Sequence, residues 1–315
     1  MRPPPHTEPY PRMPQATLVR DPALHGVTRI SHDPSFPRPH VGILGGVHGN
    51  ERCGIEAIHR LEKAVTDGEL APIAGTWVLI QGNPAAVEEG RRFTRGGADL
   101  NRLFDLTFVD ELPRERWSPE HERAHVLEPV LSDLDALLDL HSATSPTPPF
   151  AIINDLPAAA ELARRLGFGF VTHGWGGPGL LMDKVTIGIM QRVGRPAVSV
   201  ECGQHDDPET VESAWGCALA FLRACDSLDG EAPAGEPKFL EVVEIISRPS
   251  EGFRFTRPLN GLERIEAGEV IAADRIAELR VREACYVLMP NDGVPVGRDM
   301  VFLAREAMPS HPEQQ

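Results

Sequence analysis

The sequence VGILGGVHGNE, residues 41–51, passes from a short apolar run into a glycine-rich turn that ends in ionisable residues. The run Val41–Gly45 predicts a buried β-strand, and the glycines at 45, 46 and 49 allow the backbone to turn tightly after it. Apolar residues then recur at helical spacing, and the helix is expected to end at the glycine of position 68. These apolar positions are Ile55, Ile58, Leu61 and Val65.

The same alternation of strand and helix continues to about residue 230. Strands are predicted at 77–81, 136–140 and 197–200, and helices after Ser118-Pro119 and Asp207-Pro208. Strands that are apolar on both faces are typical of parallel sheets covered by helices. The sequence therefore predicts an α/β domain over residues 38–230, with a mixed, largely parallel sheet.

The two ends of the chain differ in composition from this middle part. Residues 1–37 are rich in proline, which favours an extended arm over helix or sheet. The sequence DGEAPAGEP at 229–237 is typical of a linker, and we expect a small β-rich C-terminal domain at 235–310. Its strands are predicted at 239–246, 253–257, 269–273, 278–282 and 285–289.

The chain of 315 residues is acidic, with a formal net charge of −15. This charge argues against nucleic acid or an anionic membrane as partner and favours a small solute, although a homo-oligomer is compatible with it. We expect a cytoplasmic protein, because the first residues lack the apolar core of a signal peptide and no apolar run is long enough to cross a membrane. An odd set of five cysteines without paired spacing also favours a reducing compartment.

Three of the predicted strands lead into an ionisable residue. His48 and Glu51 follow the first strand, His141 follows 136–140, and Glu201 follows 197–200. Ligands of open α/β sheets bind beyond the carboxyl ends of the strands, so we expect these side chains to meet in one crevice. Two imidazoles and one carboxylate, from His48, Glu51 and His141, leave Zn²⁺ one open coordination position.

Along the sequence, an arginine-rich loop lies between the first and the second of these strand ends. The sequence RRFTRGGADLNR, residues 91–102, carries four arginines on an otherwise acidic protein. The planar guanidinium group matches a carboxylate, and Asn101 adds an amide donor. The loop is therefore predicted to bind an anionic group.

Four motifs in this order carry a family resemblance: GGVHGNE, DLNRLF, DLHSATS and VSVECG, which together span residues 45–203. They resemble the succinylglutamate desuccinylase and aspartoacylase family, relatives of the zinc carboxypeptidases, and the β-rich tail also resembles the second domain of that family. The resemblance implies one zinc ion per chain and hydrolysis of a small anionic N-acyl amino acid.

The resemblance also implies a role for each motif residue. His48, Glu51 and His141 are expected to bind zinc, with Glu201 as the general base. Asn101 and Arg102 are expected to hold the substrate carboxylate, and an upstream arginine polarises the scissile carbonyl. Arg92 and Arg95 are both candidates for that arginine, and Arg192 is a candidate for a further substrate-binding arginine.

Three alternatives stay open at the level of sequence. His121-Glu122-Arg123-Ala124-His125 matches the His-Glu-x-x-His pattern of zinc peptidases, but it follows Ser118-Pro119 directly, so we interpret it as a solvated first turn. A carboxypeptidase shares the zinc ligands and the Asn-Arg pair. A non-catalytic zinc protein is the third alternative, although a structural site closed by four ligands needs no general base such as Glu201.

Overall fold

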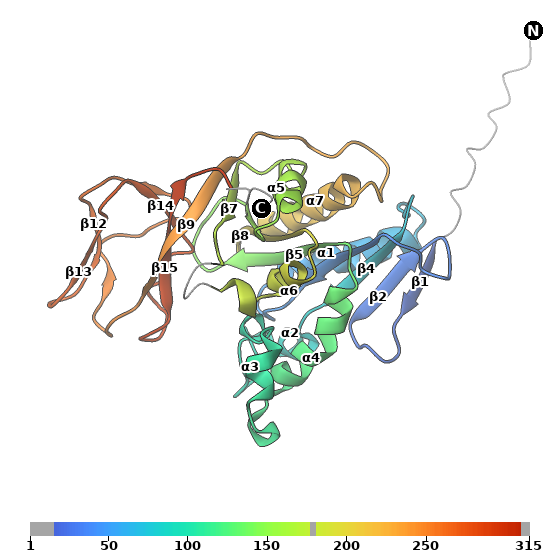
Figure 1. Ribbon diagram of the computed structural model, residues 1–315, viewed down its shortest axis with the longest axis horizontal. Helices are drawn as coiled ribbons and strands as arrows, with labels where there is room; N and C mark the ends of the chain where they lie inside the picture. The colour runs from blue at the N-terminus through green and yellow to red at the C-terminus, as the bar shows by residue number, and fades with distance from the viewer. Residues whose placement is uncertain (1–15, 177–180, 310–315) are drawn as a thin grey trace, which may run out of the picture.

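A computed structural model describes residues 16–176 and 181–309. A twelve-stranded mixed sheet runs through the molecule and continues from the α/β part into the C-terminal strands (Figure 1). In order across the sheet, the strands are β1 (Thr17–Arg20), β2 (Val27–Ser31), β4 (Thr76–Gln81), β3 (His40–Gly45), β5 (Ala136–Ala143), β8 (Ala197–Gln204), β6 (Phe150–Ile153), β7 (Phe170–His173), β9 (Lys238–Ser247), β15 (Asp299–Glu306), β14 (Cys285–Leu288) and β11 (Arg264–Ile265).

The centre of the sheet is parallel, which confirms the predicted fold class. Strand β3 pairs in parallel with both β4 and β5, and β5 pairs in parallel with β8. These strands are almost entirely buried because helices cover both of their faces. The carboxyl ends of β3, β5 and β8 therefore lie next to one another at one edge of the sheet.

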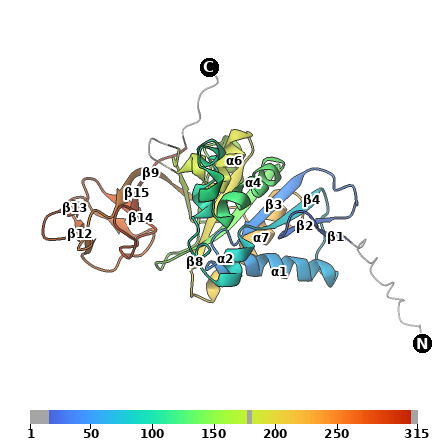
Figure 2. The ribbon, with the colours of Figure 1, turned by 90° about the horizontal axis from the view of Figure 1, so that it is seen from below.

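The helices form two layers, one on each face of the sheet (Figure 2). The helices α1 (Arg52–Thr66), α5 (Pro157–Arg164) and α7 (Glu209–Ala224) bury their apolar residues in one core cluster. On the other face, α4 (Pro119–Ser132) and α6 (Thr186–Arg192) contribute to a second cluster, with α3 (Leu106–Asp110) beside α4. Shorter helices are α2 (Pro84–Glu89) and the 3₁₀ turns η1 (Leu100–Arg102), η2 (Arg114–Arg116) and η3 (Met182–Lys184).

The N-terminal part of the sheet corrects one prediction. Strands β1 and β2 lie inside residues 1–37, which the proline content predicted to be an extended arm. Strand β2 pairs antiparallel with β4, and Val27 and Ile30 are buried in the core. The prediction is therefore wrong for these residues, because the prolines of this part fall outside the two strands. Residues 1–15 lie outside the described part.

The C-terminal strands extend the central sheet. Strand β9 pairs in parallel with β7, and β15, β14 and β11 follow it in antiparallel order. A separate three-stranded sheet, β10 (Arg254–Phe255), β12 (Val270–Ala273) and β13 (Glu278–Arg280), packs beside them. The β-rich character predicted for this part is confirmed, and it has an apolar cluster of its own around Ile265 and Val287.

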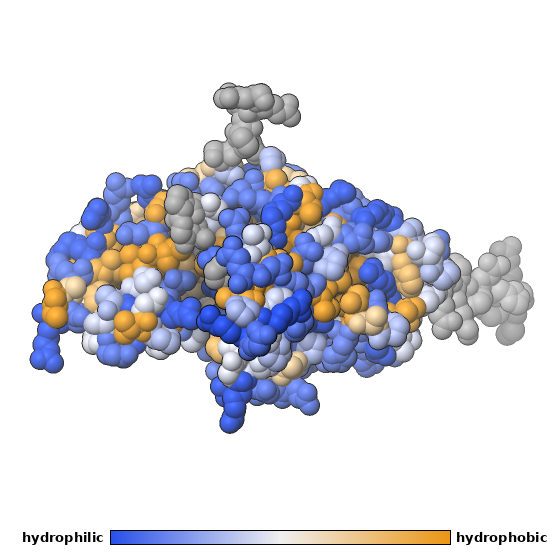
Figure 3. Space-filling model, turned by 60° about the horizontal axis from the view of Figure 1, so that its bottom comes forward, coloured by the Kyte–Doolittle hydropathy of each residue, from blue (hydrophilic) through white to orange (hydrophobic). Residues whose placement is uncertain are grey.

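One face of the molecule is mostly hydrophilic (Figure 3). Figure 3 shows polar residues over most of one face and a band of hydrophobic residues at its left, on the side of the C-terminal strands. Among the residues that the structure describes, no helix has the length and apolar character needed to cross a bilayer.

Candidate functional site

His48, Glu51 and His141 meet at the carboxyl edge of the sheet, although about 90 residues separate the two histidines. The Glu51 carboxylate lies between the two rings, 2.7 Å from His48 Nδ1 and 2.8 Å from His141 Nδ1. One ligand atom from each residue lies within 4.8 Å of the others, and all three residues are buried. This arrangement brings together the three residues that were predicted to bind zinc.

The turn between β3 and α1 places two of these residues. Gly46 has a φ of +67°, a conformation that glycine adopts without a Cβ clash. At Gly49 a Cβ would lie 2.0 Å from the backbone of Ala86, so only glycine lets the turn approach α2 this closely. The turn holds His48 after the strand and brings Glu51 to the start of α1.

Each histidine has a second carboxylate behind it. His48 Nε2 lies 3.0 Å from Asp99 Oδ1, and His141 Nε2 lies 3.0 Å from Asp139 Oδ2. Thr186 Oγ1 donates in turn to Asp139. Carboxylates behind the imidazoles fix the ring orientation and leave Nδ1 of both rings for a metal, as is common around zinc. The donor set therefore fits a divalent cation, and sequence reasoning gave Asp99 and Asp139 no role.

The electrostatics of Glu51 agree with this arrangement. Burial alone would raise the pKa of its carboxyl group, but His48 and His141 outweigh it and hold the pKa well below the usual range. Glu51 is thus an anion between two imidazoles. An anionic carboxylate of this kind is what a cation site requires.

Glu201 lies beside the three residues on β8. Its Cα is the register partner of His141, so both side chains point to the same face of the sheet. The Oε2 atom is buried and has no hydrogen-bond partner among the described residues. Burial raises the pKa of Glu201 to about 7, and the nearby Glu51 charge acts in the same direction.

The arginine-rich loop contributes Arg92 to the site but not Arg95. Arg92 donates twice to Asp99 Oδ2, at 2.9 and 3.1 Å, and its Nη1 lies 3.6 Å from Glu51 Oε1. The Arg95 side chain is exposed and is not part of the cavity lining. The backbone N–H of Arg95 donates a hydrogen bond to the Glu89 carboxylate. Of the two candidate arginines, the structure brings only Arg92 to the site.

Asn101 and Arg102 also line the cavity. Asn101 Oδ1 accepts a hydrogen bond from Thr186 N, and Arg102 Nη1 donates to Asn101 O. Burial lowers the pKa of Arg102, the Asp99 charge opposes this effect, and the Arg92 charge reinforces it. Both residues therefore line the same cavity as Arg92.

Arg192 corrects a further expectation. It lies at the end of α6, exposed, and donates to the backbone carbonyls of Asp183 and Phe104. It is not part of the cavity lining. The guanidinium group anchors the chain around η3, so Arg192 does not supply a substrate-binding arginine.

Glu120 is a buried carboxylate that sequence reasoning missed. Its Oε1 accepts hydrogen bonds from Thr94 N at 2.8 Å and Asn83 Nδ2 at 3.2 Å. Its Oε2 accepts from Ala98 N at 3.2 Å and Ser118 Oγ at 2.8 Å. One side chain at the start of α4 thus holds both sides of the turn that connects Arg92 to Asp99.

The neighbouring His-Glu-x-x-His pattern has a structural role. His121 is buried, not solvated as the sequence suggested, and its Nδ1 accepts a hydrogen bond from Ser118 N as part of a capping box. His125 Nε2 lies 2.8 Å from Asp110. The buried metal-ligand cluster that the described residues contain is the one at His48, Glu51 and His141.

These groups open into one cavity of about 490 Å³. The polar part of its lining includes the three zinc-ligand candidates and also Glu201 and His205. The Nδ1 atom of His205 lies 2.8 Å from Ser142 Oγ. Further lining residues are Ile152, Trp175, those at positions 181, 182 and 185–187, and several C-terminal residues from Met289 to Phe302. A volume of this size is typical of small-molecule sites.

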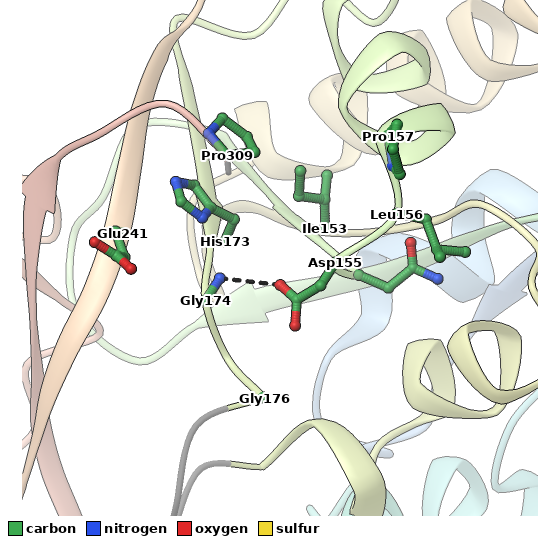
Figure 4. A pocket seen from close by; sticks show the side chains of 10 residues that line it. Ile153, Asp155, Leu156, Pro157, His173, Gly174, Gly176, Glu241 and Pro309 are labelled. Carbon is green, nitrogen blue, oxygen red and sulfur yellow. Dashed lines mark hydrogen bonds between the residues drawn. The ribbon is translucent and has the colours of Figure 1, made fainter. Parts of the chain in front are cut away.

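A second cavity of about 270 Å³ lies beyond the ends of β6 and β7 (Figure 4). The Asp155 carboxylate accepts a hydrogen bond from Gly174 N, drawn as a dashed line, and His173 Nε2 binds the carbonyl of Ala307. Asp155 and His173 hold the backbone in place here, so their contacts account for these two groups without a ligand.

Comparison with known proteins agrees with the geometry. A sequence model described as the succinylglutamate desuccinylase/aspartoacylase catalytic domain matches residues 37–211, more than half of the chain. The chain belongs to the succinylglutamate desuccinylase/aspartoacylase family. The match covers the zinc-ligand candidates and Glu201, and the family resemblance read from the four motifs is confirmed.

Individual relatives are similar over different shares of the chain. Succinylglutamate desuccinylase of Pseudomonas putida is 45% identical over 279 residues, 81% of this chain and 79% of that protein. An N-acyl-aromatic-L-amino acid amidohydrolase of Rattus norvegicus is 35% identical over 118 residues, 35% of each chain. The fold is similar to the crystal structure of succinylglutamate desuccinylase from Vibrio cholerae, with a TM-score of 0.71, 20% identity and coverage of 92% of this chain and 90% of that one.

Proposed function

We propose that this member of the desuccinylase/aspartoacylase family is a zinc-dependent amidohydrolase that deacylates a small N-acyl amino acid. The observation that carries the proposal is the buried group of His48, Glu51 and His141, with an unpartnered Glu201 oxygen beside it. The family membership supports it, because relatives are named as desuccinylases and amidohydrolases. His48, Glu51 and His141 would hold the metal.

Glu201 acts as the proton carrier in this proposal. Bound zinc would supply Lewis acidity, which lowers the pKa of water and polarises a carbonyl group. Glu201 takes the proton of the attacking water on its Oε2 atom and returns it to the leaving amine. Among the described residues, no side chain forms a hydrogen bond with that oxygen. Its burial beside Glu51 supports this role, because both raise its proton affinity.

The arginine-rich loop binds and orients the substrate. Arg92 lies close to Glu51 and faces the cavity, so it stabilises negative charge on the carbonyl oxygen. Arg102, with Asn101 beside it, binds the carboxylate of the amino acid. Asp99 contacts Arg92 and His48 at the same time and thereby fixes the position of the arginine relative to the proposed metal ligands.

The test compares the wild type with Glu201→Gln. Loading both proteins with zinc and measuring amine release from a panel of N-acyl amino acids should show chelator-sensitive turnover in the wild type. Glu201→Gln should keep its zinc and lose about 10²- to 10⁴-fold in kcat. Glu161→Gln, at an exposed position on α5, is the matched control. Near-normal turnover in Glu201→Gln, or cleavage of peptides in preference to N-acyl amino acids, contradicts the proposal.

A further inference from the structure

The cavity has two chemically different sides, and this difference follows from the register of the sheet. On the first side, His141 and Glu201 point from the paired strands β5 and β8. Ser199, two residues before Glu201, is paired with Ile152 of β6, so the same face continues with an apolar side chain. Beyond β6 the face carries the apolar cluster that includes Leu240 of β9 and Phe302 of β15.

The second side of the cavity is an apolar compartment. We define it by six lining residues from three parts of the chain: Ile152, Trp175, Leu181, Met289, Val294 and Phe302. The rings of Trp175 and Phe302 pack at 5.1 Å between centroids. The indole N–H donates to Thr172 Oγ1, so the polar atom of Trp175 is already used and the tryptophan offers the cavity only its apolar surface.

The charged C-terminal residues of the lining do not turn this compartment into a second anion site. Arg298 and Asp299 are neighbours in the lining and carry opposite charges. They act on Arg102 in opposite directions, Asp299 stabilising its cation and Arg298 destabilising it. A second substrate carboxylate near Arg298 would therefore also meet the Asp299 carboxylate. Moving a carboxylate out of water without matched donors is unfavourable, whereas an apolar group gains from the transfer.

The backbone at Met289 gives independent support. Met289 follows β14 with a φ of +48°, in the left-handed region that residues other than glycine, asparagine and aspartate seldom adopt. Its side chain lines the cavity and is partly exposed there. A strained position occupied by a large apolar residue at a cavity is a feature typical of binding sites.

We infer that the apolar compartment binds an apolar substituent next to the scissile amide, so that the preferred substrate has one carboxylate and one apolar group. This inference rests on the proposed deacylase function and adds a substrate class to it. The apolar group lies either in the amino acid side chain or in the acyl chain. In both cases an apolar group leaves water for the apolar compartment, and substrates with the apolar group at one or the other position distinguish the two cases.

The experiment compares kcat/KM of the zinc-loaded full chain on four substrates. N-acetyl-L-phenylalanine has an apolar side chain and N-hexanoyl-L-aspartate an apolar acyl chain, whereas N-acetyl-L-aspartate and N-succinyl-L-glutamate are charged at the corresponding positions. The better apolar substrate should exceed both charged references by about tenfold or more, since one well-placed apolar group contributes at least that much. A charged reference as the best substrate overturns the inference and leaves the deacylase function intact.

Failure of the deacylase function gives a different result. If none of the four compounds is hydrolysed, the proposed function is rejected. Calorimetric binding to the zinc-loaded protein then decides the inference: tighter binding of N-acetyl-L-phenylalanine than of N-acetyl-L-aspartate supports the apolar compartment, and the reverse order contradicts it.

A charge placed in the compartment provides the complementary test. Met289→Lys and Val294→Lys should each remove the preference, lowering kcat/KM for the apolar substrate about tenfold and raising it for the charged references, whose acidic group would meet the new ammonium group. Ile276→Lys is the matched control, because Ile276 is 95% exposed in the same part of the chain and outside the cavity. An unchanged preference in both folded variants overturns the inference, and thermal unfolding curves show whether the variants fold.

Discussion

Arg92 and Arg95 are three residues apart in one loop, and only Arg92 reaches the cavity. At saturating zinc, Arg92→Ala should lower kcat about 10²- to 10³-fold, the usual loss when an oxyanion donor is removed. Arg95→Ala should stay within about twofold of the wild type, because its side chain is exposed and remote from the site. Steady-state kinetics of both variants are the measurement. A larger loss in Arg95→Ala would reverse the assignment.

At the residue scale, the sequence predicted the side chains that stand at strand ends. His48 and Glu51 are recognisable because β3 ends just before them. The composition of the loop pointed to Asn101 and its arginines, and the resemblance assigned Asn101 and Arg102 to the substrate carboxylate. Asp99 and Glu120 were missed because nothing local marks a carboxylate whose partners lie far away in sequence. The Glu120 partner Asn83, for example, is 37 residues distant. Such contacts exist only once the loop has folded against α4.

Glu120 also provides a prediction about the element that it holds. Glu120→Gln replaces a carboxylate oxygen by an amide N–H₂ group that opposes the backbone donor Ala98 N, so stability should fall by about 2 kcal/mol. Glu122→Gln, two residues later and exposed, should change it little. Urea unfolding at neutral pH is the measurement. Activity should fall with stability, because the turn that Glu120 holds carries Arg92 and Asp99.

The stability difference between the wild type and Glu120→Gln should depend on pH in a definite direction. Burial raises the pKa of Glu120, but the hydrogen bonds from Thr94, Ser118 and Ala98 outweigh it and lower the pKa in the folded protein. A lowered folded-state pKa contributes stability above the ordinary glutamate value of about 4.3. The difference between wild type and Glu120→Gln should therefore persist from neutral pH to about 4.3 and shrink below it. A gap that widens on acidification would contradict this origin.

The turn between β3 and α1 provides a second prediction at the scale of elements. Gly49→Ala places a Cβ against the backbone of Ala86, which cannot move as a flexible side chain would, so stability should fall by about 2 kcal/mol. Gly216→Ala, in α7 with open space around its Cα, should raise stability by about 0.5 to 1 kcal/mol. Thermal unfolding of both variants tests the pair. Equal effects would show that the turn is not tightly packed.

Elements were predicted well where apolar runs were long and poorly where proline dominated the sequence. The strands β3, β4, β5 and β8 lie where their apolar runs placed them. Strand β5 continues past residue 140 to Ala143, because its pairing with β8 continues beyond His141. Strands β1 and β2 were missed because proline content describes a segment on average, whereas Val27 and Ile30 pack individually into the core.

At the scale of the whole molecule, the continuity of the sheet is the feature that the sequence did not predict. The linker composition at 229–237 indicated a separate unit, yet β9 pairs with β7 and so extends the sheet of the catalytic part. Pairing between strands so far apart depends on three-dimensional register, which a linear pattern does not contain. The consequence is functional, because this pairing brings Met289 and Phe302 to the same cavity as His141.

Metal binding should stabilise the whole fold, because the ligands come from distant parts of the chain. His48 and Glu51 lie just before α1, and His141 lies in β5, so an unfolded chain does not present them together. Free zinc at 100 times its Kd adds about 2.7 kcal/mol, which for a chain of this length corresponds to a rise in Tm on the order of 5 °C. Calorimetry of the chelated and the zinc-loaded protein measures this rise. His141→Ala should abolish it, whereas His125→Ala, in the His-Glu-x-x-His pattern, should retain it in full. Loss of the rise in His125→Ala with its retention in His141→Ala would move the metal to α4 and refute the proposed site.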